Sequence, residues 1–560
     1  MGMSSREQEF GFGGAITLGA MLALGAYLRF SGLLGRGLVE WDEAHYLMEA
    51  KFLHSAYAQF FNLLGALQKG DPQHLMALLD GWPIVSAKPG HAFLIFLLAV
   101  IVGMTDHVGS LLNAGLGIAT VFLVYQVGRS FWGRLVGLVS ASVLAVSGLH
   151  VMYSRSSLAE VSSSFFFLLG IYWLLLGLDG ERMNRKCLWG GGAAFGYSLT
   201  VNYRWFFVGL LLILGELAWA CFARDRVARR LLFMRVGMFF GFAALPVIFF
   251  QMPYWAAGWM GKVPEHALAG GYWQSLFWFY TVKPAQGNFQ PHGLYIRSLV
   301  LLEGFIPVAL AALGAGLSVW GWKDLRKLMV GAAMLLPLAV FSLTTRGDRL
   351  VAISLIAPFF AICAGLGADG VLSVLPGRYR KGAFLALAAL IAGLGLNRVA
   401  WNLSVQSGWK EVAEYARGRE PGKLLTFQSA IGKFYLGREM VRVPPESGAE
   451  LARYVQEGFH LLAVDWKKYH ADNYKPWIRD IEKRCKPVFS ARHDVRFFPI
   501  FVDDFHYPHP NSALPQPVNL FERILSDPSV GSIQVYDIRH YLTSKCGASA
   551  AIPSRTFLPS

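Results

Sequence analysis

Several carboxylates lie together in the sequence directly after the first long apolar run. The stretch LVEWDEAHYLMEA, residues 38–50, also places aromatic and imidazole side chains between these acids. A carboxylate at a membrane surface is suited to take a proton from an attacking hydroxyl group. We therefore predict that this stretch contributes to a reaction site. Its acidic members are Glu40, Asp42, Glu43 and Glu49, and its aromatic and imidazole members are Trp41, His45 and Tyr46.

Cationic side chains recur near the ends of the later apolar stretches. A charged group at the centre of a spanning helix costs about 2.5–3.5 kcal/mol, so such groups usually face a cavity and mark function. Cations would hold phosphate oxygens and stabilise the negative charge that develops on a departing phosphate. The pattern favours transfer of a group from a lipid phosphate, without a separate general acid. The cations are Lys88, Arg155, Arg204, Arg346 and Arg349, and Glu160 lies among them.

Each of these residues also has an ordinary structural interpretation. A single arginine at the end of a span often anchors the helix at the membrane surface. Glu160 is placed to pair locally with Arg155, and Asp42 is placed to cap an interfacial helix. His45 and His91 are also typical of membrane interfaces. Five such cations on one side of the membrane, against the expected charge bias, favour a functional cluster.

The composition indicates a polytopic membrane protein. Of the 560 residues, 54% are hydrophobic and 16% are charged, whereas soluble domains contain roughly 25% charged residues. The net charge of +15 fits the Lys and Arg enrichment of cytoplasmic loops better than nucleic-acid binding. We predict an α-helical membrane domain at residues 1–404 and a soluble α/β domain at 405–560. No nucleic-acid partner is expected.

About eleven apolar stretches are long enough to be candidate spans. With the N-terminus in the cytoplasm, the inside loops contain fifteen basic and four acidic residues, as the positive-inside rule predicts. The first outer loop, 31–108, and the C-terminal domain are then extracytoplasmic. The predicted spans are 11–30, 109–128, 135–153, 162–178, 188–201, 205–222, 232–252, 298–319, 328–344, 350–367 and 382–400.

The outer segments have recognisable secondary-structure patterns. Residues 43–67 and 71–82 read as interfacial helices, and 88–103 reads as a short helix that enters the outer leaflet. The tail alternates predicted strands and helices, which is typical of an α/β domain. It also contains Cys485 and Cys546, which are positioned for a disulfide if the tail is extracytoplasmic; whether they form one is left open.

Four short motifs occur in order between residues 11 and 400. They are Trp41-Asp42-Glu43-Ala44-His45-Tyr46, Lys88-Pro89-Gly90, Tyr153-Ser154-Arg155 with Leu158 and Glu160, and Arg349-Leu350-Val351 with Pro358. As an ordered set they resemble the motifs of the GT-C superfamily of polyprenyl-phosphate-sugar glycosyltransferases. Within it, the set is similar to the protein O-mannosyltransferase and lipid A aminoarabinose transferase branch.

The resemblance implies a GT-C fold and an inverting sugar transfer. It implies that Asp42 is the general base, with Glu43 beside it, and that the five cations contact the donor phosphate. The remaining candidates, expected to line the substrate site, are Glu160, Tyr46, His45, His91 and Tyr203. The sequence contains no dedicated ligand set for a metal, so a divalent metal is left open. The sequence departs from the motifs of this superfamily at Gly90, Glu160 and Leu350. The resemblance therefore does not assign the subfamily or the transferred sugar.

We therefore expect an integral plasma-membrane glycosyltransferase that acts on the extracytoplasmic face. Its partners would be a polyprenyl-phosphate-linked sugar, membrane lipid, and a lipid, glycan or protein acceptor. One alternative is a transporter or flippase for a lipid-linked sugar, which would place charges at mid-membrane depth and contain repeats. A second is a non-enzymatic sensor or scaffold, which leaves the acidic motif unexplained.

Overall fold

The chain divides into two compact units in the computed structural model. One unit contains residues Met1–Leu33 and Glu49–Leu403, and the other contains Leu34–Met48 and Ser404–Ser560. The predicted domain limits at 1–404 and 405–560 stay a prediction. The structure describes residues 11–62, 65, 88–178, 184–206, 208–211, 214–215, 226–259, 294–321, 324–344, 351–465, 475–495 and 531–543.

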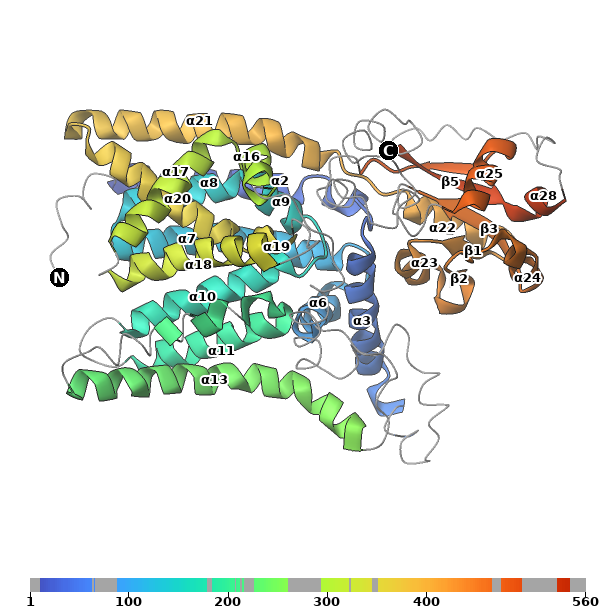
Figure 1. Cartoon of the computed structure of the whole chain (residues 1–560), viewed down its shortest axis with the longest axis horizontal. Coiled ribbons are helices and arrows are strands. Elements are labelled where there is room, and N and C mark those ends of the chain that lie inside the picture. Colours follow the sequence, from blue (N-terminus) through green and yellow to red (C-terminus); the bar gives the residue numbers. More distant parts are fainter. Residues whose placement is uncertain are drawn as a thin grey trace. The chain divides into compact units, whose positions relative to one another are not determined.

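The first unit is built from helices, many of which run side by side (Figure 1). Apart from the short turn η2 (Tyr203–Trp205), its described helices are α2 (Gly11–Phe30), α6 (Pro89–Val102), α7 (Val108–Trp132), α8 (Arg134–Ala145), α9 (Gly148–Ser154), α10 (Glu160–Leu178), α11 (Arg185–Val201), α13 (Arg226–Trp259), α16 (Leu294–Glu303), α17 (Phe305–Trp320), α18 (Leu325–Thr344), α19 (Val351–Ser354), α20 (Ala357–Ser373) and α21 (Gly377–Leu403). The short turn η1 (Leu33–Gly35) begins at the last residue of the first segment of this unit and continues into the second unit. Helix α3 (Trp41–Ala58) continues from the second unit into the first.

The long apolar helices make this a multi-pass membrane protein. Among the described residues, five helices are long and apolar enough to cross a membrane, or six if α8 and α9 form one bent span. Helices α6, α17 and α20 are apolar but shorter. The predicted count of eleven spans stays a prediction, and the predicted span 205–222 falls largely outside the described residues.

Three predicted spans are interrupted, which the apolar pattern alone did not indicate. The helix predicted at 135–153 bends by 62° between α8 and α9, where Ser147 caps the second helix. The helix predicted at 298–319 breaks at Gly304, whose φ of 90° is left-handed. The helix predicted at 350–367 is divided into α19 and α20. Apolar periodicity continues through such breaks because it reports burial rather than backbone conformation.

Glycine allows two pairs of helices in the first unit to approach closely. A Cβ atom at Gly196 of α11 would overlap the carbonyl oxygen of Ala243 on α13. A Cβ atom at Gly314 of α17 would likewise overlap the carbonyl oxygen of Cys363 on α20. Small residues at helix crossings are typical of membrane proteins, where packing replaces the hydrophobic effect as the main source of helix association.

The second unit contains a mixed five-stranded sheet, which confirms the predicted α/β fold of the tail. The strand order is β2-β1-β3-β5-β4. Strand β1 is parallel to β2 and β3, whereas β5 is antiparallel to β3 and β4. The strands are β1 (Lys423–Thr426), β2 (Val441–Arg442), β3 (Phe459–Val464), β4 (Phe489–Arg492) and β5 (Ser532–Asp537), and the helices are α22 (Trp409–Arg417), α23 (Ser429–Leu436), α24 (Leu451–Gln456), α25 (Pro476–Arg484) and α28 (Ile538–Leu542), with the turns η5 (Arg438–Met440) and η6 (Gly448–Glu450).

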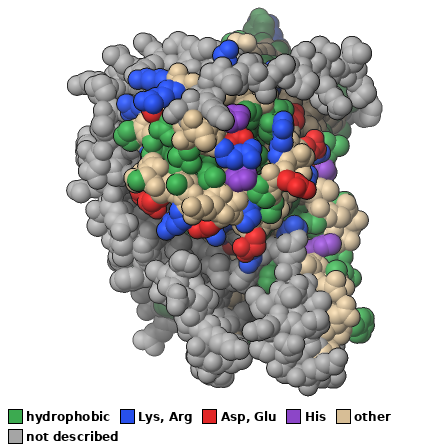
Figure 2. All heavy atoms as spheres, turned by 90° about the vertical axis from the view of Figure 1, so that its right-hand side faces the viewer, with side chains coloured by type: hydrophobic (Ala, Val, Ile, Leu, Met, Phe, Trp, Pro, Cys, Tyr) green, Lys and Arg blue, Asp and Glu red, His purple; other side chains and the backbone are tan. Residues whose placement is uncertain are grey.

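Apolar side chains from both strands and helices form the core of this unit. Leu425, Phe459 and Leu462 of the sheet pack with Trp477 and Ile481 of α25. The face of the molecule in Figure 2 carries basic, acidic and histidine side chains that are intermixed. The described surface of the unit has exposed ion pairs, as expected for a domain in water.

Candidate active site

Helix α3 begins at the acidic motif, and Glu43 fixes its first turn. The Glu43 carboxylate accepts hydrogen bonds from the backbone amides of Val39 and Glu40 at 2.9 and 3.0 Å. It also accepts a 2.8 Å hydrogen bond from the guanidinium group of Arg36. A carboxylate in the first turn that reaches back to the preceding amides is half of a capping box. Both Arg36 and Glu43 are buried, so this carboxylate holds the turn in place.

Asp42 has different surroundings from Glu43 although the two residues are adjacent. Its side chain is half-buried in the first turn of α3, where the positive end of the helix dipole stabilises a carboxylate. The neighbouring Trp41 is 38% exposed and stacks on His45 with ring centroids 4.9 Å apart. Tyr46 is buried and meets His45 edge-on. Asp42 therefore retains the exposure that a proton acceptor needs.

Lys88, Arg204 and Glu160 lie together in the first unit. One carboxylate oxygen of Glu160 lies 3.6 Å from the Lys88 ammonium and 3.4 Å from the Arg204 guanidinium. The same oxygen accepts a 3.3 Å hydrogen bond from Asn202. All four side chains are buried. Two cations and one carboxylate have a net charge of +1, and an added anion would interact favourably with this group.

The packing of Gly90 explains one departure from the motifs of the GT-C superfamily. Lys88 directly precedes α6, and Pro89 occupies the first position of that helix, which suits proline. A Cβ atom at Gly90 would overlap the Thr200 hydroxyl on α11. The Gly90 carbonyl oxygen accepts a 2.9 Å hydrogen bond from the hydroxyl group of Tyr197. Glycine therefore allows α6 to contact α11 beside Lys88.

His91 connects α6 to the turn between α9 and α10. Its Nε2 lies 2.8 Å from the carbonyl oxygen of Ser157, and its Nδ1 lies 3.0 Å from the Ser162 hydroxyl. Since a carbonyl oxygen only accepts, Nε2 carries a proton. Asn113 of α7 donates to two further carbonyl oxygens of the same turn, those of Ser156 and Leu158, at 2.7 and 2.6 Å. This network positions the segment that leads to Glu160.

Arg155 contacts the carboxyl end of α2. Its guanidinium group donates to the carbonyl oxygens of Leu28 and Arg29 at 3.2 and 3.4 Å, and to that of Ser31 at 2.6 Å. The last carbonyl groups of a helix have no partner within the helix, and an arginine can satisfy them. These contacts are those of a helix cap. The predicted role of Arg155 in phosphate binding stays a prediction.

The predicted site residues therefore fall into three sets. Asp42, Glu43, His45 and Tyr46 belong to the second unit, whereas Lys88, His91, Arg155, Glu160, Tyr203 and Arg204 belong to the first. Within the first unit, Lys88, Glu160 and Arg204 are in contact, and Tyr203 is buried in η2 next to Arg204. Arg346 and Arg349 lie outside the described residues.

Two partners in these clusters were not predicted from the sequence. Arg36 precedes Glu43 by seven residues, which lies outside the i,i+3 and i,i+4 separations that predict a side-chain pair on a helix. Asn202 lies in the predicted hairpin turn beside Arg204, and an asparagine there reads as an ordinary turn residue. The described residues contain no group of three His, Cys, Asp or Glu side chains that could hold a metal ion.

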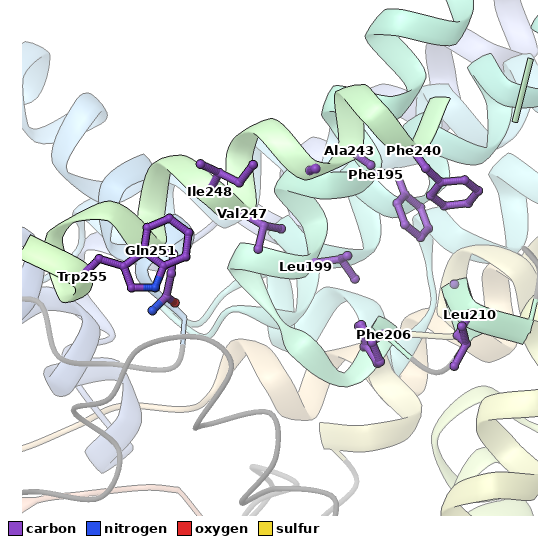
Figure 3. Close-up of a pocket in the computed structure, with 12 residues that line it drawn as sticks. Phe195, Leu199, Phe206, Leu210, Phe240, Ala243, Val247, Ile248, Gln251 and Trp255 are labelled. Carbon is purple, nitrogen blue, oxygen red and sulfur yellow. The ribbon is translucent and has the colours of Figure 1, made fainter. Parts of the chain in front are cut away.

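An apolar pocket of about 380 Å³ lies between α11, α13 and the segment after η2 (Figure 3). Its lining is aromatic and aliphatic, with the amide of Gln251 as a polar group. Leu210, Ile248 and Trp255 of this lining are exposed. Helix α11 contributes Phe195 and Leu199 to the pocket, and it also contacts Gly90 through Tyr197 and Thr200. The residues of the lining are Phe195, Leu199, Phe206, Gly209, Leu210, Phe240, Ala243, Ala244, Val247, Ile248, Gln251 and Trp255.

Comparison with known proteins gives a fold but no sequence family. No protein-family model and no curated protein sequence matches the chain. The archaeal oligosaccharyltransferase AglB from Archaeoglobus fulgidus, in complex with an inhibitory peptide and a dolichol-phosphate, is similar in structure. Its TM-score is 0.56 at 12% identity, and the match covers 91% of this chain and 75% of AglB.

A second similar protein is ArnT from Cupriavidus metallidurans. Its apo structure has a TM-score of 0.56 at 13% identity, and the match covers 85% of this chain and 95% of ArnT. Its structure bound to undecaprenyl phosphate has a TM-score of 0.53 at 14% identity, covering 80% of this chain and 93% of ArnT. Both proteins are GT-C glycosyltransferases. The chain thus has the GT-C fold, which confirms the resemblance at the level of the fold.

Proposed function

We propose that this chain is a membrane glycosyltransferase that transfers a sugar from a polyprenyl-phosphate donor to a hydroxyl acceptor. The observation that carries the proposal is the buried contact of Lys88 and Arg204 with one oxygen of Glu160, within a GT-C fold. Such a cluster at the ends of apolar helices suits a phosphate that arrives on a lipid, because the phosphate needs cations and its chain needs apolar surface. The acceptor is a lipid, a glycan or a protein.

The roles of the residues follow from their chemistry. Lys88 and Arg204 bind the phosphate oxygens of the donor and stabilise the charge that grows as the sugar leaves. Asp42 accepts the proton of the acceptor hydroxyl, whose oxygen then forms a bond to the anomeric carbon. The bond between that carbon and the phosphate oxygen breaks on the opposite face, so the anomeric centre inverts. Polyprenyl phosphate leaves with the bonding electron pair, and a general acid is not needed.

The apolar pocket of Figure 3 supports a lipid-linked donor. Its occupant in this proposal is the part of the prenyl chain nearest the phosphate. The position of the pocket near the cationic cluster supports this occupant. Helix α11 lines the pocket and also packs against Gly90, which lies two residues after Lys88. Two of the similar structures contain a polyprenyl phosphate, a dolichol-phosphate in AglB and undecaprenyl phosphate in ArnT.

The proposed reaction takes place on the extracytoplasmic face of the plasma membrane. The basic inside loops support this orientation, with the N-terminus in the cytoplasm. Cys485 in the tail is disulfide-bonded, and disulfides persist in oxidising compartments outside the cytoplasm. The predicted partner, Cys546, lies outside the described residues.

Binding of undecaprenyl phosphate to the purified full chain in detergent, measured by native mass spectrometry, tests the donor site. Removing one cation from a charge-assisted phosphate contact costs about 1.5–3 kcal/mol, so Lys88→Met and Arg204→Met are each expected to weaken binding at least about tenfold. The control Arg378→Met removes an exposed cation outside the cluster and leaves binding unchanged. Equal affinity in all four proteins would contradict the assignment of the donor site.

A further inference from the structure

The segment that precedes the acidic motif is fixed by the beginning of the C-terminal domain. The backbone amide of Ser407 donates a 2.7 Å hydrogen bond to the carbonyl oxygen of Arg36. Its hydroxyl group donates a 2.5 Å hydrogen bond to the carbonyl oxygen of Leu38, 369 residues away in the sequence. Gln428 donates to the carbonyl oxygen of Val39 at 3.5 Å. Three carbonyl acceptors on one short segment, those of residues 36, 38 and 39, thus accept hydrogen bonds from residues of the tail.

Gly37 allows this close approach. Its φ of 67° is left-handed, and a Cβ atom at this position would lie 3.1 Å from the Cβ atom of Ser407. Both the backbone conformation and the contact therefore favour glycine. The two segments therefore lie close together at this point, with little space between Gly37 and Ser407.

Ser407 is itself attached to the sheet. Its neighbour Gln406 forms an isolated bridge with Asp494, in which the Gln406 amide donates to the Asp494 carbonyl oxygen at 3.0 Å. The amide of Gly408 donates to Nδ1 of the buried His493 at 3.3 Å. Residues 493 and 494 directly follow strand β4. Ser407 therefore connects the sheet to the segment before α3.

The same chain of contacts continues to Asp42. The carbonyl groups of residues 36, 38 and 39 are held by Ser407 and Gln428, while the amides of Val39 and Glu40 are held by Glu43. With both its donors and its acceptors engaged, this segment has little freedom to move. Asp42 follows it within the first turn of α3, so the position of its carboxylate depends on these contacts.

We infer that Ser407 is a positioning residue for the Asp42 carboxylate, so that the C-terminal domain is part of the catalytic machinery rather than an appended module. This inference rests on the proposed function, in which Asp42 is the base. A displacement of about 1 Å in a reacting group can lower a rate by about a hundredfold. Loss of the Ser407 hydroxyl, with the backbone contact retained, is expected to slow transfer by about tenfold, within that range.

The test compares Ser407→Ala with Ser447→Ala in the full chain at matched expression. Ser447 is an exposed serine of the same domain whose side chain accepts a hydrogen bond from Ala449 in its own turn. Hydrogen exchange of the purified proteins reports on residues 36–45. Transfer is followed in cells as the rate of formation of the glycosylated product that is lost in the Asp42→Asn variant. Ser407→Ala is expected to speed exchange and slow transfer, and Ser447→Ala to change neither.

A second background separates positioning from a loss of folded protein. Asp42→Glu keeps a carboxylate but displaces it, so an effect that acts through Asp42 largely disappears in this background. We expect Ser407→Ala to lower the rate of Asp42→Glu by less than about twofold. The positioning role is overturned if Ser407→Ala still slows transfer tenfold in the Asp42→Glu background, or if it leaves the hydrogen exchange of residues 36–45 unchanged. Either result leaves the proposed function intact. If Asp42→Asn retains its product, the base assignment and this inference both fail.

Discussion

The guanidinium group of Arg36 donates to the carboxylate of Glu43 at 2.8 Å, and both side chains are buried. This pair assigns a structural role to Glu43, the second acid of the motif. Breaking a buried ion pair by removing one partner costs about 3–5 kcal/mol, because the other charge is left unpaired.

Glu43→Gln should therefore lower the unfolding temperature of the full chain in detergent. The double variant Arg36→Met with Glu43→Leu should recover part of this loss, because it leaves no lone buried charge. Arg453→Met is the control, since Arg453 forms exposed ion pairs, which contribute only about 0–1 kcal/mol. Full thermal stability of Glu43→Gln combined with a complete loss of transfer would instead make Glu43 the catalytic carboxylate of the motif.

In the proposed donor site, Glu160 is expected to compete with the donor phosphate for Lys88 and Arg204. Its carboxylate lies within 3.6 Å of both cations, so replacing it with a neutral amide raises the positive potential at the cluster. Glu160→Gln is expected to bind undecaprenyl phosphate several-fold more tightly, a change of about 1 kcal/mol. The control Asp106→Asn removes a carboxylate that pairs with His107 instead. Weaker binding by Glu160→Gln would show that the carboxylate supports the phosphate site rather than competes with it.

Gly90 is expected to tolerate no side chain. In Gly90→Ala the new methyl group would overlap Thr200, and overpacking of this kind costs about 1–3 kcal/mol. The thermal stability of the full chain should fall, and Thr200→Ala should restore part of it in the double variant. Gly115→Ala is the matched control, because a Cβ atom there has open space. Equal stability of Gly90→Ala and Gly115→Ala would mean that α6 and α11 do not pack as described.

The buried His493 makes the stability of the second unit depend on pH. Burial lowers the pKa of His493 from 6.5 to about 3, although the neighbouring Asp494 opposes this shift. The unfolded chain therefore binds one more proton than the folded chain between these two pH values. Stability is fully present above pH 6.5 and falls by up to about 1.4 kcal/mol for each pH unit on acidification.

Thermal unfolding of the full chain at a series of pH values measures this dependence. His493→Asn should flatten the acid side of the stability curve, because it removes the group that gains the proton. Ser447→Ala, which changes no titratable group at an exposed position of the same unit, should leave the slope unchanged. A slope that is the same in the native chain and in His493→Asn would exclude this histidine as its source.

Local patterns in the sequence were sufficient for much of the site. The apolar stretch 88–103 predicts a short helix, and α6 spans Pro89–Val102. The acidic stretch predicts an interfacial helix, and α3 begins at Trp41. The predicted topology placed Lys88, Glu160 and Arg204 on one side, and the structure places them in contact. The two helices follow from signals within a few residues of where they begin, whereas the shared side of the three residues follows from the charge bias of loops along the whole chain.

Other features depend on contacts that no local pattern contains. The grouping of residues 34–48 with the tail rests on hydrogen bonds such as that of Ser407 to Leu38, across 369 residues. Strand β4 and helices α23 and α25 were not predicted, because they are short and tertiary packing outweighs weak local propensity. The left-handed conformation of Gly304 divides a predicted span without changing its apolar pattern.

The most direct test of the central claim is lipid and glycan mass spectrometry of cells that carry either the native chain or Asp42→Asn at matched expression. The account predicts that the variant accumulates one polyprenyl-phosphate sugar while one lipid, glycan or protein loses that sugar. This result would identify the donor and the product together, and it would exclude a transporter that works without Asp42. Identical profiles in the two strains would contradict the assignment of Asp42 as the base and the proposed transfer reaction built on it.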